Sequence, residues 1–122
     1  MGGGFRHWRE SMAKSADDLE NERLKAQSSR LGATAADCLP DREVATVCGR
    51  VTAVTMPPIR SVPMLVVEVS DGTVPVQLVW LGRRQIRGLS SGTNVTATGR
   101  ITRVKGVPTI YNPRYTIRAA GQ

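Results

Sequence analysis

The chain has 122 residues, which is the length of one small domain. Its hydrophobic fraction of 40% and charged fraction of 22% are ordinary for a globular protein, and they exclude a membrane-embedded or a fully disordered chain. Lys and Arg number 17 against 10 Asp and Glu, a net charge of +7, and there are only one His and two Cys. This composition argues against a metalloenzyme and favours a basic protein that binds a polyanion.

The positive charge is concentrated in the C-terminal part of the chain. Residues 1–42 carry seven basic and seven acidic side chains, whereas residues 43–122 carry ten basic side chains and three acidic ones. The whole excess therefore lies on the last 80 residues. Such an excess of one sign favours nucleic acid as the partner, with solubility as the alternative explanation.

No stretch of the chain reaches the ~20 apolar residues that a membrane helix needs. The first residues also lack the apolar run of a secretory signal. We therefore expect a cytoplasmic protein that does not associate with a membrane. In that compartment Cys38 and Cys48 are expected to be free thiols, and a disulfide between them is the alternative.

Residues 1–42, which contain no Val or Ile, are predicted to form a helical arm and a linker. Apolar residues recur there at steps typical of a helix: Phe5, Trp8, Met12 and Leu19. A gap in this pattern at Ser15 and Ala16 predicts a short helix near 4–13 and a longer one near 16–31.

The longer helix is expected to end at Gly32. The apolar stripe of the arm is expected to pack against the rest of the chain, a second copy or a protein partner. A solvated, partly disordered arm is the alternative, because the stripe is small.

Residues 43–122 are predicted to be a domain of strands, because they contain 14 Val, 5 Ile and 10 Thr. Alternation of residue types predicts five strands, near 43–55, 62–70, 73–81, 93–104 and 107–111, the last resuming at 115–118. Asp71-Gly72 predicts a hairpin turn. Gly49 in mid-strand suggests a bulge or a bend, and Gly82 to Leu89 can hold one helical turn.

Five strands with a short helix between the third and fourth is the order of an OB-fold. The sequence therefore predicts a mainly β protein: a five-stranded OB-fold barrel in residues 43–122, preceded by the N-terminal helical arm. A simple sandwich and an SH3-like barrel are the structural alternatives.

Four segments resemble the strands of OB domains that bind nucleic acid. They are Val47-Cys-Gly-Arg-Val51, the hairpin Val67 to Trp80, Gly92 to Arg100, and Tyr111-Asn-Pro-Arg-Tyr115. Their order over residues 43–118 is most similar to the wedge domain of RecG-type branch-migration helicases and to small stand-alone OB proteins of high-GC bacteria. The sequence contains no phosphate-binding Gly-x-x-x-x-Gly-Lys-Ser/Thr loop, so this chain is not expected to translocate by itself.

An OB-fold binds its ligand on the outer face of strands two and three and on the adjoining loops. The candidate nucleic-acid-binding residues are nine basic residues and one tyrosine: Arg50, Arg60, Arg83, Arg84, Arg87, Arg100, Arg103, Lys105, Tyr111 and Arg114. Helical spacing would place Arg83 or Arg84 beside Arg87. Trp80 has the parity of Val76 and Leu78, which favours packing in the core over base stacking.

We therefore expect binding to single-stranded or branched DNA, with DNA favoured over RNA. Aromatic residues make up only 4% of the chain, so binding should be electrostatic and have little sequence preference. A role in DNA repair or recombination would follow. No catalytic set, cofactor or metal site is expected, because the sequence offers no Ser/His/Asp or Cys/His arrangement. The alternative is an OB-fold adaptor that binds protein and no nucleic acid.

Overall fold

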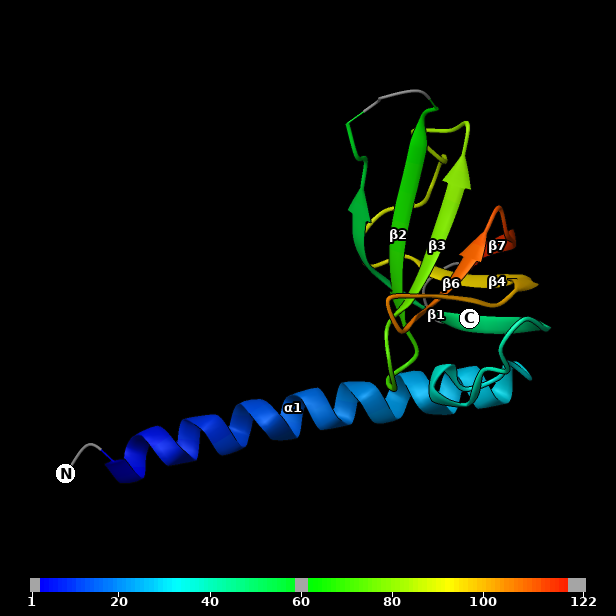
Figure 1. The fold of residues 1–122 in the computed structure, drawn as a ribbon. Coiled ribbons are helices and arrows are strands. Elements are labelled where there is room, and N and C mark those ends of the chain that lie inside the picture. Colours follow the sequence, from blue (N-terminus) through cyan, green and yellow to red (C-terminus); the bar gives the residue numbers. More distant parts are fainter. Residues whose placement is uncertain (1–2, 59–61, 119–122) are drawn as a thin grey trace.

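The structure is a computed structural model, which describes residues 3–58 and 62–118, with side chains from residue 16 onward. A long helix and a 3₁₀ turn are followed by seven strands (Figure 1): α1 (Gly3–Arg30), η1 (Ala36–Cys38), β1 (Val44–Thr55), β2 (Met64–Ser70), β3 (Val76–Leu81), β4 (Asn94–Arg100), β5 (Thr102–Val104), β6 (Val107–Tyr111) and β7 (Arg114–Arg118). The protein is therefore mainly β with one helix ahead of the sheet, as predicted.

All seven strands belong to one sheet, in the order β5-β6-β3-β2-β1-β4-β7. The long strand β1 is shared between two partners, since its first half pairs with β4 and its second half with β2. Neighbouring strands are antiparallel except for β3 and β6, which are parallel. The arrangement is consistent with an OB-fold, but the sheet has seven strands and is not closed, so the predicted five-stranded barrel is wrong.

Ile101 accounts for part of this difference. It lies between β4 and β5, outside both strands, and thereby divides the predicted fourth strand in two. Its backbone bonds to the segment before β1 instead: Ile101 N donates to Glu43 O at 2.9 Å, and Arg42 N donates to Ile101 O at 2.8 Å. The side chain is fully buried. The predicted last strand also becomes two strands, β6 and β7, and β7 pairs with β4.

The helix predicted between the third and fourth strands does not form. Residues 82–93, all of which the structure describes, contain only turns and irregular segments. Gly82, Gly88 and Gly92 have φ values of 85°, 83° and 93°. A right-handed helix cannot pass through these left-handed conformations, so the chain crosses this end of the sheet as a loop.

The inward faces of the strands follow the predicted alternation and form the core. Leu65, Val67 and Val69 of β2 face Val76, Leu78 and Trp80 of β3, and Val95, Ala97 and Ile110 complete the same buried cluster. Alternation also predicts that Ala53 and Val74 face inward, but both are exposed. The register of β1 against β2 shifts between Val51 and Ala53, and Val74 lies before the start of β3. The bulge therefore lies after Gly49.

Gly49 itself is needed for close packing of β1 on β2. A Cβ atom at this position would lie 2.4 Å from the carbonyl oxygen of Ser70 and 2.7 Å from a methyl group of Val69. No such contact is tolerated, so the glycine allows the two strands to cross closely.

The helix α1 is continuous, which corrects the prediction of two helices separated at Ser15 and Ala16. Neither residue is a Gly or Pro that would interrupt the backbone. The predicted end is confirmed: Gly32 has φ 72°, its amide donates to Ser29 O, and Ala33 N donates to Ser28 O, both at 3.1 Å. The first half of the helix extends away from the strands (Figure 1).

The second half of α1 and the linker pack against the sheet. Leu24 and Ser28 of α1 are buried, and Ala36 and Leu39 of the linker belong to the core. Leu19, however, is 61% exposed, so the sheet, one of the covers expected for the apolar stripe, does not cover this residue. The other members of the predicted stripe, Phe5, Trp8 and Met12, have side chains outside the described residues. Whether a second copy covers the stripe stays a prediction.

Candidate nucleic-acid interface

The outer face of β2, β3 and β6 presents one aromatic ring. The strand register places Val66 beside Val79, and Val79 beside Tyr111. Tyr111 is 46% exposed, whereas Val79 is buried beneath this surface. Among the side chains that the structure describes, Tyr111 is the single exposed aromatic one. The face therefore offers one stacking position.

Asn112 holds Tyr111 at the end of β6. Its own backbone is left-handed, with φ 48°. Asn112 N donates to Val79 O at 2.7 Å, and Leu81 N donates to Asn112 Oδ1 at 2.9 Å. These two bonds secure the end of β6 against β3, so the backbone that carries the Tyr111 ring is ordered before any ligand arrives.

The turn between β5 and β6 carries Lys105. Lys105 and Gly106 have φ values of 51° and 81°, the two left-handed residues of a tight hairpin. Lys105 is exposed, whereas the side chain of Arg103, two residues earlier on β5, has protein partners. Its Nε contacts the Asp41 carboxylate and its Nη2 donates to Leu39 O at 3.1 Å.

The segment after β3 carries the three arginines that were predicted to cluster on a helical turn. Because no helix forms there, the predicted helical adjacency to Arg87 is wrong. Arg84 is half-buried and its Nη1 donates to Pro57 O at 2.9 Å. Arg83 and Arg87 are exposed.

A second basic surface lies on β4 and β7. Arg114 at the start of β7 is opposite Thr98 of β4, and Arg100 lies at the end of β4. An open depression of about 620 Å³ runs across these strands and is lined by Thr96, Thr98, Pro113, Arg114, Tyr115 and Thr116. Arg100 Nη1 donates to Arg42 O at 2.6 Å.

The remaining two predicted basic residues lie elsewhere. Arg50 on β1 forms a salt bridge with Glu20 of α1. Arg60 lies outside the described residues. No hydrogen bond or ion pair within the described part of the chain engages the side chains of Arg83, Arg87, Lys105 and Arg114. These four are available to a phosphate, whereas Arg50 and Arg103 would first have to leave a carboxylate.

Trp80 packs in the core, as predicted, and is only 3% exposed. Its ring meets that of Tyr115 edge-on, with centroids 5.5 Å apart and planes at 85°. Tyr115 is half-buried by this contact. Neither ring is presented to a nucleobase.

Two acidic residues of the strand domain, Glu68 and Asp71, accept hydrogen bonds within the protein. The Asp71 carboxylate is buried and accepts three hydrogen bonds, and Glu68 Oε1 accepts one from Thr52 Oγ1 at 3.0 Å. Among the described residues, no group of three or more His, Cys, Asp or Glu side chains is arranged to hold a metal ion. The same residues include no helix of the length and hydropathy that crossing a membrane requires.

The two cysteines are free thiols, as expected, Cys38 exposed and Cys48 buried. A hydrogen bond to Asp37 and the negative charge of that carboxylate raise the pKa of the Cys38 thiol. Cys48 Sγ accepts a hydrogen bond from Arg118 Nη2 at 2.7 Å, and Arg118 was not among the predicted site residues. Strand alternation places Arg118 on the same face of β7 as Arg114 and Thr116. This alternation is the sequence signal that could have identified Arg118 as a candidate.

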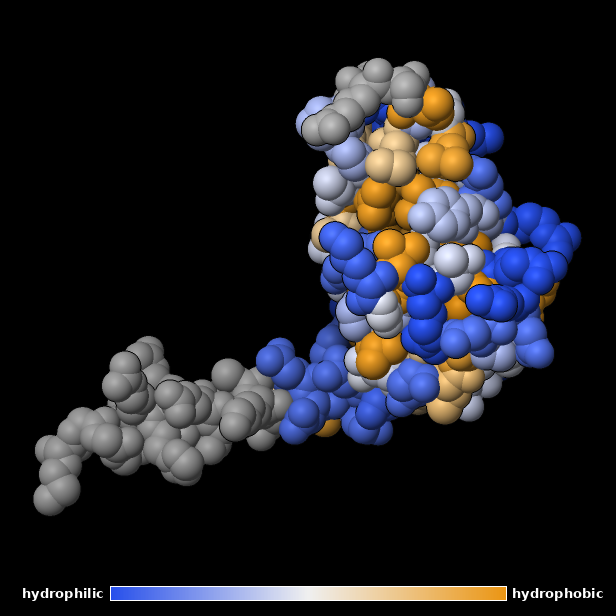
Figure 2. Space-filling model, viewed as in Figure 1, coloured by the Kyte–Doolittle hydropathy of each residue, from blue (hydrophilic) through white to orange (hydrophobic). Residues whose placement is uncertain are grey.

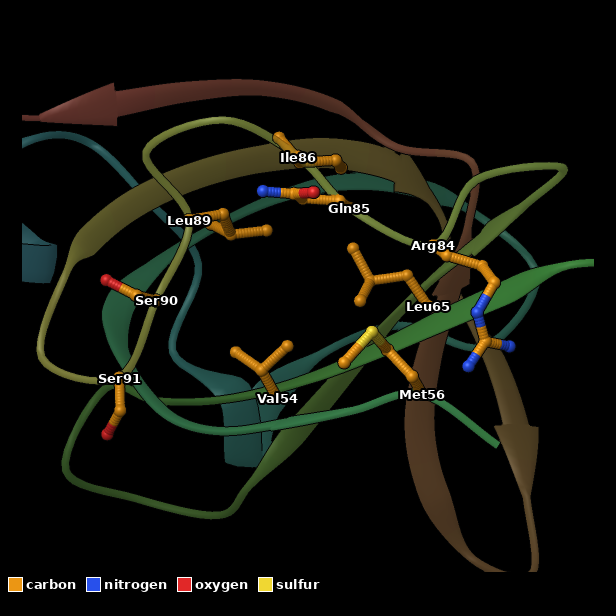
Figure 3. Close-up of a pocket in the computed structure, with 9 residues that line it drawn as sticks. All are labelled: Val54, Met56, Leu65, Arg84, Gln85, Ile86, Leu89, Ser90 and Ser91. Carbon is orange, nitrogen blue, oxygen red and sulfur yellow. The ribbon is translucent and has the colours of Figure 1, made fainter. Parts of the chain in front are cut away.

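A pocket of about 520 Å³ was also missed by sequence reasoning. It lies between the end of β1, the start of β2 and the loop of residues 84–91 (Figure 3). Five apolar residues line it: Val54, Met56, Leu65, Ile86 and Leu89. A helical turn at Gly82 to Leu89, as predicted, would fill this end of the sheet, so no pocket was expected there from the sequence.

Comparison with known proteins agrees with this fold. Residues 45–118 match the family model of the tRNA anti-codon type, described as an OB-fold nucleic acid binding domain. A solved structure of RecG bound to a three-way DNA junction is similar over 69% of this chain, with 25% identity and a TM-score of 0.56. The similar region spans 12% of that RecG chain. No curated protein matches. The predicted resemblance to OB domains and to RecG is thereby confirmed, and the chain belongs to the family of OB-fold nucleic acid binding domains.

Proposed function

We propose that this protein binds single-stranded or branched DNA with little sequence preference, and that it acts in DNA repair or recombination. The observation that carries the proposal is a set of cations, Arg83, Arg87, Lys105 and Arg114, that make no hydrogen bond or ion pair within the described residues, together with the single exposed aromatic ring among the described side chains. Such a surface holds a phosphate backbone through charge and reads little of the base sequence.

The branched ligand is supported by two features. One similar solved structure is that of RecG bound to a three-way DNA junction. In this chain Lys105 lies on the β5–β6 turn and Arg114 on β7, and β5 and β7 are at opposite ends of the strand order. Cations distributed over separate edges of a small domain suit a ligand with more than one phosphate backbone.

Binding is to be measured for single-stranded, duplex and forked DNA and for single-stranded RNA of equal length, over a series of salt concentrations. The proposal expects the forked and single-stranded DNA to bind more tightly than duplex, with log K falling linearly with log salt. Tighter binding of RNA than of any DNA would contradict the DNA assignment. No binding of any nucleic acid at low salt would contradict the function as a whole.

The rival function is a protein adaptor without nucleic-acid binding, and the small number of exposed aromatic residues favours it. We also propose that the arm contacts a second copy or a protein partner, which is compatible with nucleic-acid binding, because α1 extends away from the domain (Figure 1). Sedimentation of the purified chain over a range of concentrations tests self-association. A cytoplasmic location is part of the same proposal.

A further inference from the structure

The loop of residues 84–91 leaves an apolar pocket at one end of the sheet. In the close-up, the side chains of Val54, Met56, Leu65 and Leu89 point toward a common space (Figure 3). Leu65 is buried at its base, whereas Met56 is 53% exposed and Val54 36% exposed. Apolar side chains that face water in this way gain from an apolar occupant.

The pocket is hollow because this loop is not a helix. The left-handed Gly88 turns the chain, and Ile86 and Leu89 are drawn into the core on either side of it. Figure 2 shows apolar residues on the upper part of the domain and, among charged residues, lower down on the same face. The start of β2 and the loop after β3 lie at the end of the strands away from α1 (Figure 1), so the pocket lies at the opposite end of the domain from the docked helix.

Polar side chains at the margin of the pocket supply the hydrogen-bond donors and acceptors that the edge of a heterocyclic base requires. No hydrogen bond within the described residues engages the exposed amide of Gln85. The hydroxyls of Ser90 and Ser91 make only long bonds, at 3.3 Å to Thr93 Oγ1 and 3.5 Å to Thr52 O. These groups can exchange such bonds for contacts to a ligand that carries both donors and acceptors.

Charge identifies the ligand class. Arg84 lines the pocket and is half-buried, with its Nη1 donating to Pro57 O at 2.9 Å. Arg83 and Arg87, close to it in the chain, are exposed, and neither has a protein partner among the described residues. An apolar peptide would have no use for these cations, whereas a nucleotide presents an apolar base face and a phosphate together. We propose that this pocket receives one unstacked nucleobase of a bound strand, while Arg83 and Arg87 contact the adjoining phosphates. The inference rests on the proposed function.

Two oligonucleotides of equal length and equal phosphate number distinguish insertion of a base from binding to the phosphate backbone alone. One is oligothymidine, and the other carries abasic sites throughout. The parent chain should bind oligothymidine about tenfold more tightly, because only that strand has bases to insert. Met56→Trp and Ser91→Phe, which fill the pocket from its margin, should abolish most of this preference while leaving the affinity for the abasic strand and the salt dependence unchanged. Val74→Trp, at another exposed apolar position, is the matched control and should keep the preference.

A second measurement needs no substitution and so does not depend on whether the filled variants fold. Photocrosslinking of the parent chain to a strand whose bases carry a diazirine, which inserts into aliphatic and aromatic side chains alike, should modify residues 84–91 or Met56. Crosslinks confined to Tyr111 and the outer face would overturn the pocket assignment.

The outcomes distinguish the two proposals. If the parent binds both strands equally, or if the filled variants keep the parent's preference, the pocket inference fails and the proposed function stands. If the parent binds neither strand, the proposed function fails. If the parent is a dimer that the filled variants convert to a monomer, the pocket is a protein interface, and the nucleobase inference is overturned.

Discussion

The Asp71 carboxylate accepts a hydrogen bond from the backbone amide of Ala36 at 2.8 Å, and this bond ties the linker after α1 to the turn between β2 and β3. The other carboxylate oxygen accepts from Thr73 N at 3.0 Å and from Thr73 Oγ1 at 2.5 Å. Asp71 is 3% exposed. One side chain therefore shapes the hairpin that the sequence predicts and also secures a segment 35 residues away.

Replacing Asp71 should destabilise the whole domain. Asp71→Ala leaves the amides of Ala36 and Thr73 without their acceptor, at a cost of about 1–3 kcal/mol for each unsatisfied buried donor. Asp71→Asn keeps one carbonyl acceptor and should cost less. Urea unfolding followed by circular dichroism measures both. Glu43→Ala, at an exposed acid, is the control, and an equal loss in that variant would refute the assigned role.

Shortening the arm tests the domain boundary at residue 42, which stays a prediction. A chain that begins at residue 16 retains Leu24, Ser28 and the linker, so its unfolding midpoint should match that of the full chain. A chain that begins at residue 37 should still fold, because residues 43–118 contain nearly all of the core. It loses the buried side chains of Leu24 and Ala36, and the leucine alone contributes about 1.5–3 kcal/mol. Thermal denaturation that shows no cooperative transition for this shorter chain would place the boundary before residue 37.

The unpaired cations should carry the salt dependence of binding. Changing Arg83, Arg87 and Lys105 together to Gln removes up to three phosphate contacts, and the log–log salt slope for a single strand should fall by roughly 2, at ~0.7 per contact. Arg50 and Arg103 are the matched control, because Glu20 and Asp41 already neutralise them. Their change to Gln should alter the slope less. Fluorescence anisotropy with one labelled oligonucleotide compares the variants, and a larger effect in the control pair would move the interface toward α1 and the linker.

Tyr111 should contribute a modest stacking term. Its ring is 46% exposed at the secured end of β6, and a stacked base is worth ~1–3 kcal/mol. We expect Tyr111→Ala to weaken binding by about 1 kcal/mol, since one ring cannot form the continuous platform of a strong single-strand binder. Tyr111→Phe should restore the affinity. If both variants bind as the parent does, the outer face of β3 and β6 takes no part in recognition.

The Cys38 thiol should react slowly with alkylating agents. Its pKa is raised by the hydrogen bond to Asp37 and by that carboxylate's charge, so less thiolate is present at any given pH below the pKa. The alkylation rate should therefore rise only at more alkaline pH than for a model thiol. Asp37→Asn should shift the rate profile toward lower pH. Buried Cys48 serves as the internal control, and mass spectrometry distinguishes the two sites.

The sequence by itself determined the features that depend on local order. Alternating residues place Leu65, Val67 and Val69 on one face of a strand whatever that strand pairs with, so the core of β2 was predictable. The same parity put Trp80 inside. Gly32 ends α1 through bonds within five residues, and the charge difference between the two parts of the chain needs only counting.

Tertiary structure alone decided which of the predicted site residues are free. Arg50 meets Glu20 across 30 residues and Arg103 meets Asp41 across 62, and no local pattern reports such pairs. The divided strand at Ile101 likewise results from bonds to Arg42 and Glu43, far back in the chain. The pocket beside Leu89 exists because three glycines adopt left-handed backbones where a helical turn was also compatible with the sequence. In each case the deciding contact joins distant segments, and its partner is known only once the chain has folded.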